Sequence, residues 1–500
     1  MKVLLGWFTI LALVLAIDIQ AQVQLGSEVL AANGFKELLG KRVGLITNPS
    51  GVNRSGQSTI DLLHSAPGVR LVSLFGPEHG VYGDVKAGEN IHNKTDKRTG
   101  LPVHSLYGGT RKPTPAMLQG LDALVYDLQD TGVRSYTFIS TMGLAMEACA
   151  VAGVEFIVLD RPNPLGGERA EGPMVEDRFR SFVGQWDIPY AYGLTCGELA
   201  RMINGEGWIR KPCKLTVIPM KGWRRSMVWQ NTGLRWVPTS PNVPRAESPL
   251  YYAATGLFGE IAGGSGANIG TRIKRPFECV IAPWLDARKF SAAMNSYGLR
   301  GVSFPTFSVT HEGKKLQGVL LKFTDAAHAP LVALNFHLLE GLRQASGRDL
   351  FREAVKAKKD FQMLDRVSGS DATRKALLTG RSAADIVNSW KPGEEAFQRE
   401  RQEYLFYTDE LPTPPKVVAQ AKPAPGPVAA SVPSASALPL GAPQASPEMM
   451  IVTVSKGDTA EKIAKDLGIA ASDITLANRG VDLNRLKAGQ KLRIPRPSAR

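Results

Sequence analysis

The stretch LVSLFGPEHG, residues 71–80 of this 500-residue chain, indicates both its fold class and its chemistry. Its apolar first half has the length of a buried strand. Gly76 and Pro77 end that strand, because proline cannot donate a ladder hydrogen bond. Glu78 and His79 therefore follow on a loop, at the strand end where open α/β sheets bind their ligands. The stretch predicts acid chemistry at a sheet edge.

The sequence around this stretch alternates between strand-like and helix-like patterns. Apolar strands are also expected at residues 43–47, 123–127 and 155–160, and a helix at about 141–152. Near-continuous apolar strands separated by helices indicate a parallel sheet covered on both faces. We therefore expect an α/β fold in which a Rossmann-like parallel-sheet domain is followed by a smaller α/β subdomain.

Composition divides the chain into five parts. We expect a signal peptide at 1–21, a Rossmann-like catalytic subdomain at 22–216, a second catalytic subdomain at 217–410, a Pro/Ala-rich linker at 411–448 and a small module at 449–496. A short basic start, an apolar run and a small residue before the cut mark the signal peptide, with an N-terminal membrane anchor as the alternative. After cleavage no stable membrane insertion is expected.

The formal net charge of +14 favours a polyanionic partner. The export signal argues against nucleic acid, so the anionic cell envelope fits better and a periplasmic or secreted location is expected. The seven histidines are scattered and no HExxH occurs, so we expect no metal and no cofactor. The glycine-rich residues 259–270 lack the lysine of a phosphate-binding loop, which disfavours a nucleotide.

Polar residues follow each predicted strand, and parallel strands bring such residues to one edge. They are Asn48, Glu78, Asp127, Asp130, Asp160, Arg161 and Asn163. Cleavage of a glycosidic bond needs a protonated acid and usually a second carboxylate. Glu78 is the favoured acid, since an apolar strand and a second subdomain would shield it from water and favour its neutral form.

Structural alternatives stand beside these assignments. Asp127 and Asp130 are candidates for capping the next helix, because carboxylates are preferred at N-caps. Asp160 and Arg161 are candidates for a local ion pair that shapes the following turn. His79 has the alternative of hydrogen bonding within its loop. The tyrosines and tryptophans at 107, 126, 136 and 236 are candidates for stacking on sugars or for the core.

Four blocks of the sequence carry a family resemblance. They read KRVGLITNPSG at 41–51, FGPEHG at 75–80, YDLQDTGVR at 126–134 and DRPNP at 160–164. Together they resemble the exo-β-N-acetylmuramidase (NamZ) family over roughly residues 25–407. The resemblance implies release of N-acetylmuramic acid from non-reducing ends of peptidoglycan fragments, with the active site between two subdomains.

The resemblance implies that Glu78 is the catalytic glutamate, and Asp127, Asp160 or Glu260 is expected as the second group. The second subdomain departs from the Glu-Gly-Thr-Asn and Ser-x-Gly-Arg-Gly-Thr segments of many members. Arg272 or Arg134 is expected to replace the missing arginine and meet the lactyl carboxylate, since a guanidinium binds a carboxylate bidentately. The expected substrate-binding residues are His79, Asn48, Asp130, Arg134, Arg161, Asn163, Asn242 and Arg272.

The C-terminal module resembles a LysM domain, a βααβ fold that binds peptidoglycan and chitin. Its marks are VTVSKGDT at 452–459, Asn478 and GQKLRIP at 489–495. The resemblance implies peptidoglycan and muropeptides as partners, and a tethered module raises the local substrate concentration. Two rival functions remain at this point: a non-catalytic peptidoglycan-binding protein of the envelope, and a peptidoglycan peptide or ester hydrolase.

Overall fold

The computed structural model divides the chain into two compact units, Met1–Thr413 and Pro414–Arg500. The residues it describes are 22–83, 94–409, 449–454, 458–467, 491–495 and the single positions 474, 478 and 486. The expected signal peptide at 1–21 and linker at 411–448 lie outside the described residues.

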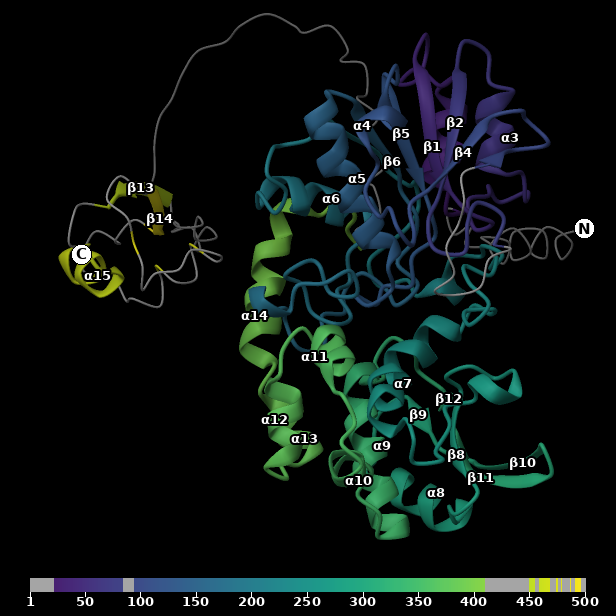
Figure 1. Cartoon of the computed structure of the whole chain (residues 1–500), viewed down its shortest axis with the longest axis vertical. Helices are drawn as coiled ribbons and strands as arrows, with labels where there is room; N and C mark the ends of the chain where they lie inside the picture. The colour runs from purple at the N-terminus through teal and green to yellow at the C-terminus, as the bar shows by residue number, and fades with distance from the viewer. Residues whose placement is uncertain are drawn as a thin grey trace, which may run out of the picture. The chain divides into compact units, whose positions relative to one another are not determined.

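A seven-stranded sheet forms the first subdomain of the larger unit (Figure 1). Its order is β3-β4-β2-β1-β5-β6-β7, and every neighbouring pair is parallel except β3 with β4. The strands are β1 (Arg42–Thr47), β2 (Arg70–Gly76), β3 (Lys94–Thr95), β4 (Pro102–Ser105), β5 (Ala123–Asp127), β6 (Glu155–Leu159) and β7 (Leu215–Ile218). The four predicted strands are confirmed as β1, β2, β5 and β6, and the expected α/β class is confirmed with them.

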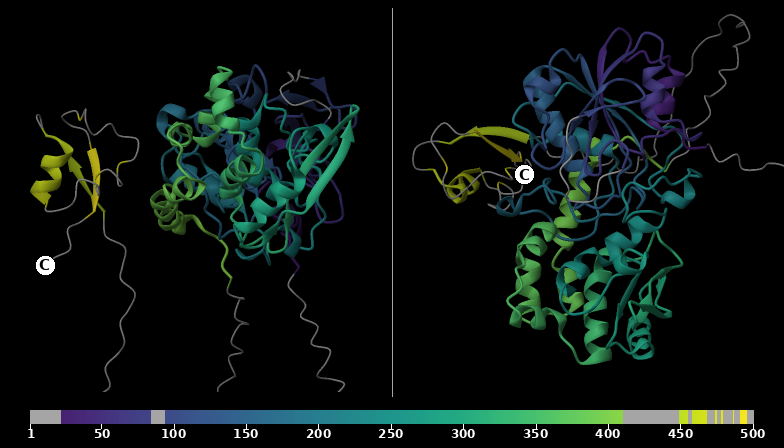
Figure 2. Two further views of the ribbon diagram at one scale, coloured as in Figure 1. Left: turned by 90° about the horizontal axis from the view of Figure 1, so that it is seen from below. Right: turned by 45° about the vertical axis from the view of Figure 1, so that its right-hand side comes forward.

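Helices cover both faces of this sheet, as Figure 2 shows. One face packs against α5 (Phe138–Ala152) and α6 (Cys196–Gly205), with α4 (Pro115–Leu118) beside α5. The other face packs against α2 (Gly26–Ala32) and α3 (Thr59–His64). Because both faces are covered, the central strands β5 and β6 are buried at every position and read as continuous apolar runs.

The strand order reverses between β1 and β5, since the chain adds later strands first on one side and then on the other. The crevice at such a reversal, outside the carboxyl ends of the strands, is where open α/β sheets hold ligands. Here the loops after β1 and β5 meet, and the backbone N–H of Gln129 donates to Ser50 Oγ over 3.0 Å.

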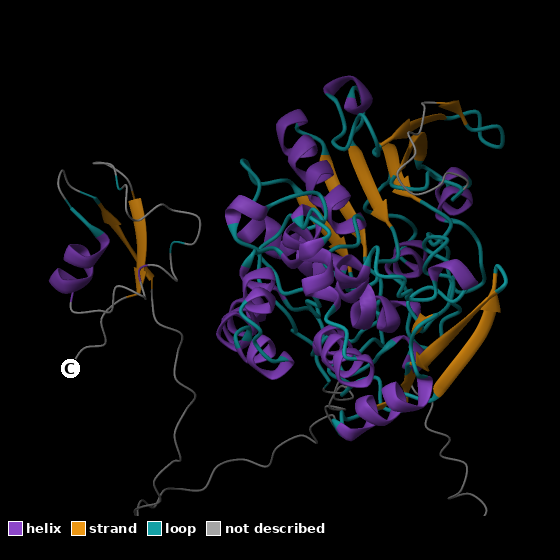
Figure 3. Ribbon diagram, turned by 60° about the horizontal axis from the view of Figure 1, so that its bottom comes forward, coloured by secondary structure: helices purple, strands orange, loops and turns teal. Residues whose placement is uncertain are grey.

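The second subdomain contains a three-stranded antiparallel sheet in the order β10-β11-β8, visible as orange arrows in Figure 3, and the pair β12-β9. Its strands are β8 (Cys279–Ala282), β9 (Val302–Ser303), β10 (Thr306–His311), β11 (Lys314–Leu320) and β12 (Lys322–Phe323). Its helices are α7 (Ser248–Ala262), α8 (Ala287–Ser296), α9 (Leu331–Ser346), α10 (Leu350–Lys356), α11 (Gln362–Ser368), α12 (Ala372–Leu378) and α13 (Ala383–Asn388). Packing of α7 and α8 on α9 closes the main core of this part.

The chain crosses between the subdomains twice. The expected boundary at 216/217 falls inside β7, which belongs to the first sheet. After α13, the helix α14 (Lys391–Glu400) leads back to the first subdomain, where the following turn packs on α6. Tyr407 then donates to Asp160 Oδ2 over 2.5 Å and accepts from the Met220 backbone N–H over 2.9 Å. The second subdomain is thus inserted between β7 and this closing segment.

The described part of the C-terminal unit is a pair of antiparallel strands and one helix. Strand β13 (Met449–Thr453) pairs with β14 (Lys491–Pro495), and α15 (Ala460–Leu467) contributes Ile463 and Ala464 to a small apolar core. Of the second helix that a βααβ module would have, only Ile474 is described. Within the described residues, no helix is long and apolar enough to cross a membrane.

Candidate active site

Glu78 lies in a tight turn directly after β2. The backbone N–H of Gly80 donates to the Pro77 carbonyl over 2.9 Å, so Glu78 and His79 occupy the two central positions of the turn. His79 has a φ of 71°, a left-handed conformation that is costly for a residue with a Cβ. Gly76 is needed because a Cβ there would lie 2.9 Å from a backbone nitrogen of the folded-back chain. The turn holds Glu78 at the carboxyl edge of the sheet.

Two hydroxyl groups contact the Glu78 carboxylate. Thr137 Oγ1, just before α5, donates to Oε2 over 2.9 Å. Tyr107 also hydrogen-bonds Glu78, and burial together with the charge and hydrogen bond of Glu78 raises the pKa of Tyr107 to about 12. Tyr107 therefore stays protonated at neutral pH. Glu78 is half-buried, so its carboxylate is held in place and still reachable, while the neighbouring His79 is buried.

A pair of tyrosines links this region to the second subdomain. The rings of Tyr136 and Tyr252 lie 6.2 Å apart in an edge-to-face arrangement. Burial raises the pKa of Tyr136, and the negative charges of Asp130 and Glu78 raise it further. Burial also raises the pKa of Tyr252, with the charge of Glu260 among the further causes. The charge of Glu78 thus raises the pKa of Tyr136, and the charge of Glu260 raises the pKa of Tyr252.

Asp130, which follows β5, is buried with an incomplete set of partners. Its Oδ2 accepts from the Gly132 backbone N–H over 2.7 Å and from Tyr192 over 2.5 Å. Its Oδ1 is buried without a hydrogen-bonding partner among the described residues. Burial raises the pKa of Asp130 to about 7, although its hydrogen bonds act in the opposite direction.

Replacing Asp130 by Asn should therefore change how stability depends on pH. Because the folded-state pKa of Asp130 lies above its unfolded value of about 3.9, its contribution to stability is present below that value and is lost as pH rises through about 7. Relative to Asp130→Asn, the wild type should lose about 1 to 3 kcal/mol of unfolding free energy between about pH 4.5 and 7.5. Urea titrations across this range measure the difference. The prediction would be contradicted if the unfolding free energies of the two proteins changed with pH in the same way.

Asp127 and Arg161 form a buried ion pair across neighbouring strand ends. Arg161 Nη2 lies 3.0 Å from Asp127 Oδ2, Arg161 Nε donates to Oδ1, and Thr59 also donates to Oδ2. The side chains are 0% and 4% exposed. The alternative that Arg161 pairs with its neighbour Asp160 is wrong, because parallel strands bring the loop after β5 beside the loop after β6. The helix-capping alternative for Asp127 and Asp130 is also wrong, since Thr137 occupies the N-cap position of α5.

Asp160 is occupied by hydrogen bonds of the framework. Thr195 Oγ1 donates to Oδ2 over 2.7 Å, and the backbone N–H groups of Gly197 and Arg161 donate to Oδ1 over 2.8 and 3.0 Å. Tyr407 supplies the fourth bond. Burial raises the pKa of Asp160 to about 6 despite these donors. Its carboxylate thereby fixes the start of α6 and the closing segment of the chain.

The three candidate asparagines lie in different surroundings. Asn48 is buried, accepts from the Ser50 hydroxyl over 2.6 Å and donates to the Thr239 carbonyl over 3.3 Å. Asn163 is buried and donates to a backbone carbonyl over 2.9 Å. Asn242 is exposed in the connection to the second subdomain. Thr239 therefore joins two side chains: its carbonyl accepts from Asn48, and its hydroxyl accepts from Tyr136 over 2.8 Å.

Arg134 is fully buried and joins the subdomains through backbone carbonyls. It donates to Pro173 over 2.6 Å, to Ile188 over 2.5 Å and to Val367 over 2.9 Å. Burial lowers its pKa to about 10. Two nitrogens of Arg134 thus donate to protein oxygens. The other candidate arginine, Arg272, differs from it in being exposed.

A cavity of about 560 Å³ lies beside the glycine-rich loop of the second subdomain. Both Glu260 and Arg272 line it, together with Tyr190 of the first subdomain and Tyr252. Burial raises the pKa of Glu260, and the charge of Lys359 partly opposes this effect. The structure thus brings two of the predicted site residues, Glu260 and Arg272, together in one cavity that Tyr252 also lines.

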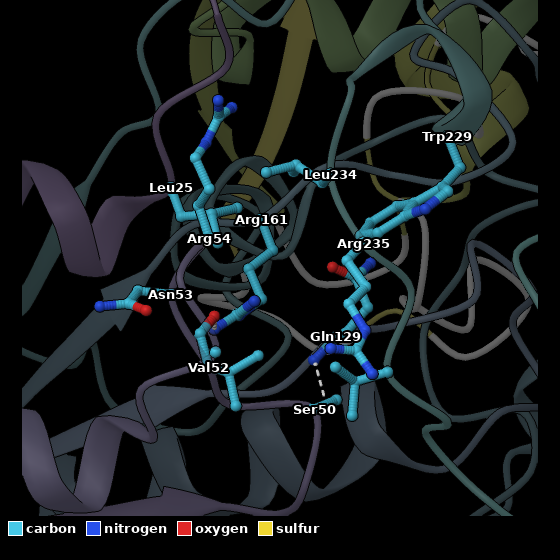
Figure 4. Close-up of a pocket in the computed structure, with 12 residues that line it drawn as sticks. Leu25, Ser50, Val52, Asn53, Arg54, Gln129, Arg161, Trp229, Leu234 and Arg235 are labelled. Atoms are coloured by element: carbon cyan, nitrogen blue, oxygen red, sulfur yellow. Dashed lines mark hydrogen bonds between the residues drawn. The ribbon is translucent and has the colours of Figure 1, made fainter.

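A second cavity, of about 260 Å³, lies at the reversal of strand order and is shown in Figure 4. Ser50 and Gln129 meet there after β1 and β5, and Arg161 enters from the end of β6. The cavity contains none of the residues that hydrogen-bond Glu78 in the described chain.

Sequence reasoning missed Thr137 and Tyr252 as neighbours of the candidate acids. No local pattern marks them, because Thr137 reaches Glu78 from 59 positions away and Tyr252 comes from the other subdomain. Tyr107 and Tyr136, expected either on sugars or in the core, lie around Glu78. Tyr126 is a core residue whose hydroxyl donates to a backbone carbonyl. Across the described residues no three His, Cys, Asp or Glu side chains are grouped to hold a metal ion.

The larger unit is an α/β protein that presents a carboxylic acid at the carboxyl edge of a Rossmann-like sheet, where a second subdomain meets the first. Three family models match the chain. They are the exo-β-N-acetylmuramidase NamZ N-terminal domain at residues 43–247, the NamZ C-terminal domain at 250–407 and the LysM domain at 452–495. The chain belongs to the exo-β-N-acetylmuramidase NamZ family, a family of glycosidases, as its sequence blocks predicted.

Similarity to known proteins supports this family membership. The peptidoglycan β-N-acetylmuramidase NamZ of Bacillus subtilis (strain 168) is 42% identical over 399 residues, covering 77% of this chain and 92% of the relative. Two crystal structures of DUF1343 family proteins from Bacteroides fragilis NCTC 9343 are also similar. One is 46% identical with a TM-score of 0.71 and covers 77% of this chain and 99% of its own. The other is 28% identical with a TM-score of 0.59 and covers 78% and 100%.

Proposed function

We propose that this chain is an exported glycosidase that releases N-acetylmuramic acid from the non-reducing ends of peptidoglycan fragments, with Glu78 as general acid and base. One observation carries the proposal: Glu78 is presented on a left-handed turn at the sheet edge, between two hydroxyl donors, in a chain 42% identical to a peptidoglycan β-N-acetylmuramidase. Thr137 and Tyr107 orient the carboxyl group so that it faces the glycosidic oxygen of a bound sugar.

Among the candidates for the second carboxylate, Glu260 is supported best. Both oxygens of Asp127 are bonded by Arg161 and Thr59, and both oxygens of Asp160 accept hydrogen bonds from the framework. Glu260 instead lines a cavity together with Tyr252, a member of the tyrosine pair. In the proposed mechanism Glu78 protonates the leaving oxygen, while the second carboxylate acts at the opposite face of the sugar as nucleophile or as base for water.

The remaining polar residues take supporting roles in this proposal. His79 shapes the turn that carries Glu78, Asn48 holds the loop after β1, and Arg272 faces the sugar from the glycine-rich loop. Asp130, Arg134, Arg161 and Asn163 hold the strand-end loops in position. Asn242 lies on the connection between subdomains.

Product analysis tests the proposal directly. Intact muropeptides with N-acetylmuramic acid at the non-reducing end are incubated with the full-length protein, and the released compounds are identified by mass spectrometry. Free N-acetylmuramic acid is the expected product. Freed peptides or acetate would identify a peptide or ester hydrolase, and unchanged muropeptides that sediment with the protein would identify a binding protein.

The LysM domain should act on localisation rather than on bond cleavage. Ending the chain at Thr413 removes the C-terminal unit and leaves the larger unit complete. We expect about 100-fold weaker sedimentation with peptidoglycan sacculi, because a tethered module raises effective concentration. Turnover of a small chromogenic β-N-acetylmuramide should stay within about twofold, since none of the proposed catalytic groups is removed. Undiminished sedimentation would contradict this role.

A further inference from the structure

The cavity at the reversal of strand order has an unusual set of charges for its size. Of the described residues that line it, three are arginines, Arg54, Arg161 and Arg235, and none is a carboxylate (Figure 4). Arg161 is already neutralised by its buried partner Asp127. Among the described residues, Arg54 and the exposed Arg235 have no side-chain ion pair. The Glu28 carboxylate lies behind the lining, where it accepts from the backbone N–H groups of Leu25 and Arg54 over 2.8 and 3.1 Å.

Unused hydrogen-bonding groups accompany this charge. Arg54 donates through Nη2 to a backbone carbonyl over 2.7 Å, but its Nη1 is buried without a partner in the described chain. The indole nitrogen of Trp229, another lining residue, is also buried and unpartnered there. Buried donors left without an acceptor are costly, and an anion relieves that cost best.

Gln129 adds an acceptor whose orientation is fixed. Its side-chain nitrogen donates to the carbonyls of Asp130 over 2.9 Å and Pro162 over 2.8 Å. The amide therefore cannot be flipped, and Oε1 is the atom that remains without a partner in the described residues. Gln129 is 2% exposed. A ligand here would place a hydroxyl or N–H group near Gln129 and an anionic group near the arginines.

The cavity is small and partly apolar. Its volume of about 260 Å³ lies just below the usual range of about 300–1,000 Å³ for ligand pockets, so it suits one small molecule or one substituent. Leu25, Leu234 and Val237 supply apolar walls. Leu25 is the N-cap residue of α2, whereas Thr137, which donates to Glu78, is the N-cap residue of α5. The described residues that line the cavity thus differ from those that hydrogen-bond Glu78.

We infer that this cavity binds the carboxylate of a small hydroxylated acid, with Arg54 and Arg235 as the cationic contacts and Gln129 as the acceptor for the acid's hydroxyl or N–H group. A D-lactyl group has this chemistry. Its source is either the lactyl substituent of N-acetylmuramic acid, the sugar of the proposed function, or a free hydroxy acid. Only the choice between these sources rests on the proposed function.

Calorimetric titration of the full-length Glu78→Gln protein with D-lactate tests the inference without any turnover. Neutral D-lactamide, which lacks only the charge, should bind at least 10-fold more weakly. Arg235→Gln in the same background should weaken D-lactate binding at least 10-fold. Arg210→Gln removes the same charge at a side chain that is 94% exposed and does not line the cavity, so it should leave binding unchanged.

A competition experiment then names the source. A disaccharide with N-acetylmuramic acid at its non-reducing end either displaces D-lactate, which assigns the carboxylate to the substrate, or binds together with it, which assigns it to a free acid. Both results support a carboxylate site. Equal binding of lactate and lactamide, no binding of lactate, or Arg235→Gln protein that binds lactate like its parent would overturn the inference. None of these outcomes depends on whether N-acetylmuramic acid is released.

Discussion

Glu78→Gln should lower kcat on a chromogenic β-N-acetylmuramide by at least about 1,000-fold, because the amide cannot transfer a proton to the leaving oxygen. The amide keeps the size of the side chain and can still accept from Thr137, so the turn after β2 should remain folded. KM should change much less than kcat, since the lost interaction belongs to the transition state. Steady-state kinetics and a thermal unfolding curve measure both parts.

The matched control is Glu312→Gln, which makes the same chemical change at a side chain that is 83% exposed in the second subdomain. It should turn over substrate like the wild type. A folded Glu78→Gln protein with near-normal kcat would remove Glu78 from the mechanism and direct attention to Glu260. The thermal unfolding curve shows whether the variant is folded, and so distinguishes a loss of catalysis from a loss of structure.

The largest expected effect on stability comes from Arg161→Met. This change leaves the Asp127 carboxylate, which is 0% exposed, with Thr59 as its one remaining donor among the described side chains, so we expect a loss of about 3 to 5 kcal/mol in unfolding free energy. It also removes the contact from Arg161 to the Val52 carbonyl, which ties the loop after β1 to the end of β6. Urea unfolding followed by circular dichroism measures the change.

The double variant Asp127→Asn, Arg161→Met gives the control for this prediction. It removes the unpaired buried charge, so it should be clearly more stable than Arg161→Met alone. If the single variant loses less than about 1 kcal/mol, the ion pair contributes little and the strand-end loops are held by their backbone contacts. If the double variant is no better than the single one, the effect comes from lost packing rather than from charge.

The sheet could be predicted from the sequence because its central strands are buried on both faces. Such strands read as short apolar runs, and Gly76 with Pro77 marks the end of the decisive one. Glu78 could be placed at the carboxyl edge for the same reason. The short strands β3 and β4 and the half-buried edge strand β7 carry weaker patterns and were missed.

Partners across loops could not be predicted in the same way. An ion pair of Arg161 with Asp160, its neighbour in sequence, was expected. Instead Arg161 pairs with Asp127, 34 positions away, because the ends of parallel strands lie side by side. Arg134 was expected to meet a ligand carboxylate, and it donates to the carbonyl of Val367, 233 positions along the chain. A guanidinium suits both environments equally well, so residue type alone does not distinguish them.

The double crossing of the chain between β7 and the closing segment at Tyr407 restricts how the two subdomains move. A body attached by a single linker can swing and twist freely, whereas one attached at two points rotates mainly about the line that joins them. Here those points are the connection after β7 and the passage through α14. Arg134 adds a buried link through the Val367 carbonyl, so we expect the subdomains to move little relative to each other and Tyr136 to stay packed against Tyr252.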